Sequence, residues 1–173
     1  WMFEGSYTWS HLYGNYEGMV YSDVGQDDAG ITQLFDFAGL MDNTYGNLPQ
    51  DRRHNLKIFG AYTFDFGLQL GANATYRTGR PINALGVHPT DPYSQDYGVS
   101  TYYQQGVPAP RGNFGSTDDV TYLDLMVKYD FNWGVNWFVR MDVFNLFNQS
   151  AVTEIAEGAD QASSNPPDYV INP

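Results

Sequence analysis

Residues 67–81 read GLQLGANATYRTGRP, and the side chains alternate in character along this stretch. One set carries no charge and ends in an aromatic ring: Leu68, Leu70, Ala72, Ala74 and Tyr76. The set between them is polar apart from one glycine: Gln69, Gly71, Asn73, Thr75 and Arg77. A period of two places successive side chains on opposite faces of a β-strand. The stretch therefore predicts a strand with one apolar face, which looks either to a water-excluded core or to lipid.

The same alternation appears in four further stretches, residues 1–13, 54–64, 122–131 and 135–144. None of the five apolar faces contains Lys, Arg, Asp or Glu. Each stretch has roughly the 9–11 residues that a strand needs to cross a bilayer at a tilt. A soluble antiparallel sandwich, with one sheet face on a core and the other in water, would alternate in the same way. The alternation alone leaves both interpretations open.

The lengths of the connections favour the membrane. The links 65–67 and 132–134 are very short, whereas about forty residues separate Tyr13 from His54 and Thr78 from Tyr122. Loops of that length are uncommon in compact soluble domains. Short turns on one side and long loops on the other are typical of outer-membrane barrels.

The aromatic residues point the same way. Eight of them gather at the short-turn ends of the stretches: Trp1, Phe3, Phe64, Phe66, Tyr129, Phe131, Trp133 and Trp137. Tyr13 and Tyr76 lie near the long-loop ends. Such rings form girdles at the two edges of the hydrocarbon layer. The chain is therefore predicted to be all-β, a five-strand segment of an antiparallel transmembrane β-barrel with apolar faces on lipid and polar faces on a lumen.

Composition excludes several other classes. The net charge of −12 argues against nucleic acid as a partner, and the chain has no cysteine for a disulfide or a thiolate metal site. Fifteen of the twenty acidic residues lie in the two long connections and in the segment after residue 148. We expect no cofactor, since the sequence shows no phosphate loop or dinucleotide fingerprint. Ser10 and His11 point to opposite faces, and the strand register brings no Ser-His-Asp group together, so an enzyme is not predicted.

The motif RMDVFNLFNQ, residues 140–149, resembles the penultimate barrel strand of TonB-dependent outer-membrane receptors. Four more segments agree in order and spacing, and together they resemble the barrel end of the Oar-like receptors: SYTWSHLYGNYEG, LPQDRRHNLKIFGAYTFDFG, TYRTGRPINALGVHP and RGNFGSTDDVTYLDLMVKYDF. The resemblance covers nearly the whole chain.

This resemblance implies a 22-stranded barrel filled by an N-terminal plug, with the five strands as the seventeenth to twenty-first. Residues 1–173 would then be a partial C-terminal barrel domain that lacks the plug, the TonB box and the closing strand. The long loops would be extracellular and the short turns periplasmic. Five strands cannot close a barrel, and lipid does not tolerate unpaired edges. We therefore expect a piece of a larger chain in the outer membrane of a Gram-negative bacterium.

Two groups of side chains are candidate sites. Aromatic rings among prolines in the second long loop suit the capture of a peptide or a sugar, or equally pack the loop on itself: Tyr93, Tyr97, Tyr102, Tyr103 and Phe114. Charged residues on the polar faces are expected to form a structural network in the lumen: Lys57, Arg77, Lys128, Arg140, Asp124 and Asp142.

Three local features give narrower expectations. The acidic segment 22–37 lacks the ordered spacing of a calcium loop, so we expect a solvated loop and no metal. His54 is expected to form a hydrogen bond at a strand entrance.

Unbroken alternation would put Asn145 in lipid and Leu146 in the lumen, so we predict a β-bulge between Val143 and Leu146. The Asn145 amide would then bond nearby backbone.

The leading functional hypothesis is a transporter that takes up a large substrate such as a peptide. Its partners would be outer-membrane lipid and the TonB energy-coupling complex, the latter through the plug. The first alternative is a barrel whose acidic loops serve adhesion or surface assembly without transport. The second is a soluble carbohydrate-binding sandwich.

Overall fold

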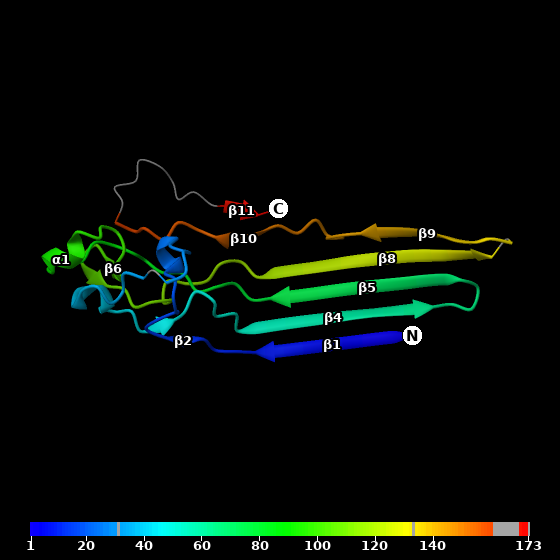
Figure 1. Cartoon of the computed structure of the whole chain (residues 1–173), viewed down its shortest axis with the longest axis horizontal. Coiled ribbons are helices and arrows are strands. Elements are labelled where there is room, and N and C mark those ends of the chain that lie inside the picture. The colour runs from blue at the N-terminus through cyan, green and yellow to red at the C-terminus, as the bar shows by residue number, and fades with distance from the viewer. Residues whose placement is uncertain (31, 133, 161–169, 173) are drawn as a thin grey trace.

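The computed structural model describes residues 1–30, 32–132, 134–160 and 170–172. A long, narrow sheet occupies one end of the molecule, and the two long connections fold together with the segment after the fifth strand at the other end (Figure 1). We call the folded part, which comprises the described residues of 10–53, 78–119, 144–160 and 170–172, the loop assembly.

Five strands form the sheet, in the order β1-β4-β5-β8-β9, and every neighbouring pair is antiparallel. Their bounds are Met2–Trp9 for β1, His54–Thr63 for β4, Leu68–Arg77 for β5, Val120–Asn132 for β8 and Asn136–Val143 for β9. All five predicted strands are therefore confirmed. The first ends at Trp9 rather than at Tyr13, and Tyr13–Gly14 (β2) pairs instead with Gly46–Asn47 (β3) in the loop assembly.

The register keeps the two faces of the sheet separate, because directly opposed residues share a face. Leu70 lies between Tyr62 and Val127, and on the other face Asn73 lies between Phe59 and Asp124. The same register brings the remaining apolar sets of the five strands together. The predicted apolar and polar faces are therefore confirmed as continuous surfaces.

The apolar face is uncovered. Phe3 is 65% exposed, Val139 55% and Met141 58%, and within the described residues no second sheet packs on this face. Val120, where β8 leaves the loop assembly, is the buried hydrophobic residue of the sheet. A soluble sandwich would cover one face with a second sheet. In the part of the chain that the structure describes, no helix is long and apolar enough to cross a membrane.

The turn between β4 and β5 is as short as predicted. The Phe64 amide donates to the Leu68 carbonyl (2.7 Å), and the Gly67 amide donates to the Phe64 carbonyl (3.0 Å). Gly67 has a positive φ of 93°, and a Cβ there would lie 2.7 Å from the Asp130 carbonyl oxygen. Only glycine satisfies both conditions without strain.

Aromatic rings gather at this end of the sheet, as the sequence predicts. Phe64 meets Tyr62 edge-on at 4.7 Å and packs on Phe66 at 5.2 Å between ring centroids. Phe131 and Trp137 stack at 3.9 Å across the last strand pair. Trp133, which we also placed here, lies outside the described residues.

The predicted irregularity at the end of β9 is present. Val143 lies opposite Leu125, so unbroken pairing would set Asn145 opposite Leu123. Instead the Leu146 amide donates to the Leu123 carbonyl (2.8 Å), which is a displacement of one residue. Asn145 adopts the left-handed conformation (φ 48°), and its side chain bonds the Gln149 backbone through both amide atoms at 3.0 Å. The displacement lies beyond Val143, where β9 ends, so the paired part of the strand contains no bulge. The predicted bond between the Asn145 amide and nearby backbone is confirmed.

Replacement of Asn145 by alanine is expected to destabilise this turn by about 1–2 kcal/mol. The change removes two hydrogen bonds, each worth roughly 1 kcal/mol, and puts a residue that avoids the left-handed region into it. Asn145→Gly keeps the backbone conformation accessible and should lose less. Equilibrium urea unfolding of the complete barrel measures both, and an alanine variant as stable as the wild type would contradict the assigned role.

Short elements shape the loop assembly. They are the 3-10 turns η1 (Ser22–Val24) and η2 (Ala38–Met41), the helical turn α1 (Pro92–Gln95), the hairpin of β6 (Tyr103–Gln104) with β7 (Val107–Pro108), and the pair of β10 (Ala151–Glu154) with β11 (Val170–Asn172). The largest buried cluster of the described residues lies here: Tyr21, Leu34, Leu85 and Tyr102, with Val24, Met41 and Val99 packed against it. The long loops are therefore folded around a core of their own.

The expectation of a solvated acidic segment was wrong at two residues, because Leu34 belongs to the buried cluster and Asp23 is buried as well. Asp27 and Asp28 are exposed, but the Asp23 side chain is fully buried beside Arg111. The countercharge comes from a different loop, so the local sequence around Asp23 gives no sign of it.

Candidate functional site

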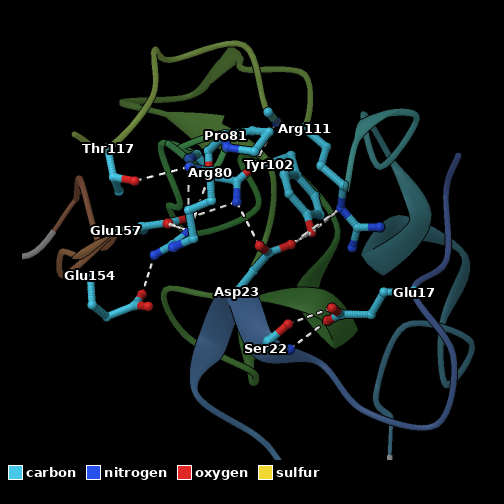
Figure 2. A network of polar contacts seen from close by, with 12 residues as sticks. Glu17, Ser22, Asp23, Arg80, Pro81, Tyr102, Arg111, Thr117, Glu154 and Glu157 are labelled. Atoms are coloured by element: carbon cyan, nitrogen blue, oxygen red, sulfur yellow. Dashed lines mark hydrogen bonds and ion pairs between the residues drawn. The ribbon is translucent and has the colours of Figure 1, made fainter. Parts of the chain in front are cut away.

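Three loops meet at a buried polar network (Figure 2). Its centre is Asp23, on η1, which accepts hydrogen bonds from the Tyr102 hydroxyl (2.5 Å) and the Asn83 amide (2.7 Å). The Arg111 Nε lies 3.2 Å from the same carboxylate, and neither charged side chain is exposed. Since a buried charge is costly unless it is paired and hydrogen-bonded, each of these partners is needed.

The electrostatics of this centre favour neutral tyrosines beside a single ion pair. Burial raises the pKa of Asp23, while the Tyr102 hydrogen bond and the Arg111 charge oppose that rise. Burial also raises the pKa of Tyr102 and of Tyr21 far above the ordinary tyrosine value, so both hydroxyls stay protonated as donors. The guanidinium carbon of Arg111 lies 4.8 Å from the Tyr102 ring centroid, within cation–π range.

The second half of the network binds the third loop. Arg80 forms ion pairs with Glu157 and Glu154, and burial raises the pKa of Glu157 against the opposing effect of Arg80. Asn83 joins the two halves, because its amide nitrogen donates to both Asp23 and Glu157 (2.6 Å). The network therefore fixes the three loops against one another.

The structure separates the five predicted ligand-binding rings. Tyr102 is wholly buried, so its ring belongs to the core. Tyr103 is half-buried, with its hydroxyl on Asp42 (3.2 Å). Tyr93, 63% exposed, and Tyr97 lie together at the end of the loop assembly, and Phe114 is exposed elsewhere.

One member of this ring group, Phe37, was not predicted from the sequence. Phe37 stacks on Tyr93 at 5.3 Å between centroids and meets Tyr97 edge-on at 6.0 Å. It lies in the acidic segment 22–37, which we judged for its charge alone. The two aromatic residues at the end of that segment, Phe35 and Phe37, were the available signal.

The predicted lumen charges lie on the polar face, and their ion pairs run along single strands. Arg140 bonds Asp142 (2.7 Å), and Lys128 bonds Asp130 (2.8 Å), each two residues further on. Asp124 accepts from the Asn73 amide across the strand pair (3.1 Å). Lys57 and Arg77 share this face by register, opposite Thr75 and Asn55.

The three histidines lie apart from one another. The Nδ1 atom of His54 lies 2.7 Å from the Tyr7 hydroxyl at the strand entrance, as predicted. The Nε2 atom of His88 lies 3.1 Å from the Asp42 carboxylate, and that of His11 lies 3.0 Å from the side-chain amide oxygen (Oδ1) of Asn47. Among the described residues, no three side chains of the types that ligate metals come together.

An open antiparallel sheet with one uncovered apolar face and one charged face defines a segment of a transmembrane β-barrel. The chain is 37% identical over 167 residues to the TonB-dependent transporter Oar of Myxococcus xanthus. The match covers 90% of this chain and 14% of that relative. The resemblance to the Oar-like TonB-dependent receptors is thereby confirmed. No family model matches the chain, and no solved structure matches it.

Proposed function

We propose that this chain is part of an outer-membrane, TonB-dependent transporter that imports a large substrate such as a peptide. The observation that carries the proposal is the two-faced sheet, together with the similarity to a TonB-dependent transporter. In this proposal the apolar face contacts lipid, the polar face lines the lumen, and the loop assembly contacts substrate outside the cell. Catalysis plays no part in it.

Physical chemistry supports the lipid contact. Contiguous apolar patches of more than a few hundred Å² are rare on soluble monomers and mark membrane or protein contacts. Each Å² of that surface left in water forgoes about 25 cal/mol of stabilisation. Rings at the end of the sheet, such as Phe66 and Trp137, suit the interface between hydrocarbon and water.

The edges of the sheet support a larger barrel. Within the described residues β1 and β9 each have one strand neighbour, so each leaves one edge open. Lipid does not tolerate open edges, and further strands of a complete barrel would pair with them. The resemblance implies 22 strands, with a plug that couples to TonB.

Sidedness gives a test, because the chain has no cysteine and single cysteines can be introduced cleanly. Asp28→Cys, in the exposed part of the first loop, is expected to react with a membrane-impermeant maleimide on intact cells. Asp65→Cys, in the β4–β5 turn, should react only after the outer membrane is permeabilised. The reverse labelling pattern would invert the proposed topology.

Transport itself is tested in cells that carry the complete barrel. Uptake of a labelled peptide library should stop when TonB is deleted or the proton gradient is dissipated, whereas the barrel should remain in the membrane. An adhesive barrel would give no energy-dependent uptake. The folded acidic loop assembly would suit that alternative as well, so energy dependence is the property that separates the two.

A further inference from the structure

The ring group at the end of the loop assembly is a formed surface, which we call the aromatic platform: Phe37, Tyr93 and Tyr97. The Phe37 and Tyr93 rings are within 15° of parallel, and they are 39% and 63% exposed. Figure 1 shows α1, which carries Tyr93, at the end of the loop assembly farthest from the sheet. The platform therefore lies where a partner from solution would first meet the molecule.

Close backbone packing holds the platform in place. Asp91 caps α1 by accepting from the Tyr93 amide (3.2 Å) and the Ser94 hydroxyl (2.6 Å). Gly39 in η2 lies so close to the Asp91 and Ser94 side chains that a Cβ at this position would collide with both. The Tyr97 hydroxyl donates to Asp36 (2.8 Å), which ties the second loop to the first. The rings are thus ordered before any ligand arrives, which lowers the entropic cost of binding.

The charges of the loop assembly select the ligand. Its four arginines all serve internal contacts: Arg80 and Arg111 are buried in ion pairs, Arg53 pairs with Asp51, and Arg52 donates to the Thr78 carbonyl. Both lysines of the chain lie in the sheet. Four exposed aspartates remain on the surface: Asp27, Asp28, Asp36 and Asp96. Asp36 and Asp96 are the chain neighbours of Phe37 and Tyr97 in the platform.

We propose that the aromatic platform binds a positively charged peptide segment, with an Arg or Lys side chain against an exposed face of the Phe37–Tyr93 stack and with Asp36 and Asp96 at the rim. The faces of Phe and Tyr attract cations, and neighbouring carboxylates add to that attraction. A neutral sugar would also stack on such rings, but the carboxylates at the rim would add nothing to its binding. This inference rests on the proposed function, for which it names the substrate class.

The test uses the complete barrel, purified into lipid nanodiscs, and a fluorescent nonapeptide rich in Arg and Lys. Phe37→Ala and Tyr93→Ala are each expected to weaken binding two- to five-fold, which is what an exposed cation–π contact supplies. Phe114→Ala removes an exposed ring away from the platform and is the matched control, with no change expected. Tyr93→Phe keeps the ring and should bind like the wild type.

Several results would overturn the inference. The basic peptide could fail to bind, or a Glu-rich nonapeptide could bind as tightly as the basic one. The Phe114→Ala control could lose as much binding as the platform variants. A neutral oligosaccharide could bind in place of the peptide and depend on the same rings. The assay needs no energy source, so its failure is distinct from failure of the transport proposal. Energy-dependent uptake without peptide binding in nanodiscs would reject the platform alone. Peptide binding without energy-dependent uptake would reject transport alone.

Discussion

Replacement of Arg111 by methionine is expected to open the loop assembly, at a loss of about 3–5 kcal/mol in its stability. The change leaves the Asp23 carboxylate buried without its countercharge, and it removes the cation from the Tyr102 ring. Hydrogen exchange measured by mass spectrometry should show lost protection in all three loops, and retained protection in β4 and β5. Asp96→Asn, at an exposed acid, is the control and should leave protection unchanged.

The double variant Asp23→Asn, Arg111→Met sharpens this result. The double variant removes both charges, so that no unpaired charge stays buried, and part of the lost protection from hydrogen exchange should return. If Arg111→Met had no more effect than Asp96→Asn, the ion pair would not hold the loops together. If the double variant were as open as Arg111→Met alone, the unpaired charge would not be the cause.

Val139→Arg in the complete barrel is expected to cost roughly 2–4 kcal/mol in folding into lipid. Val139 lies on the apolar face, opposite Tyr129, and is 55% exposed in this sheet. Asp142→Asn alters the polar face, where its partner Arg140 is also exposed, and should cost far less. The shift in gel mobility between heated and unheated samples reports folding of the barrel. Equal losses in the two variants would contradict the assigned faces.

The sheet could be predicted from sequence because its information is local. A period of two sets the face of every residue from Leu68 to Arg77, and the short links leave the chain no choice but antiparallel pairing. The same reasoning found the displacement at Asn145, where the alternation changes phase. It placed the end of β1 too late, because His11 and Tyr13 continue the pattern after the strand has turned into the loop assembly.

The loop assembly could not be predicted in this way because its contacts are distant in sequence. Tyr102 donates to Asp23 across 79 positions, and Tyr97 donates to Asp36 across 61. A buried aspartate and an exposed one are identical in the sequence of an acidic loop. Tyr102 was therefore grouped with exposed rings, although it is part of the core, and Phe37 was left out of the group it completes.

Accessibility along β5 tests the central claim, that one face of this sheet contacts lipid and the other a lumen. Single cysteines at residues 68–77 in the complete barrel, labelled with a nitroxide in a bilayer, would report contact with oxygen from the lipid and with a water-soluble relaxation agent. We predict that oxygen access peaks at Leu68, Leu70, Ala72 and Ala74, and that the water-soluble agent reaches Gln69, Asn73 and Thr75. Equal access to both agents along the strand, or the opposite phase, would contradict the account.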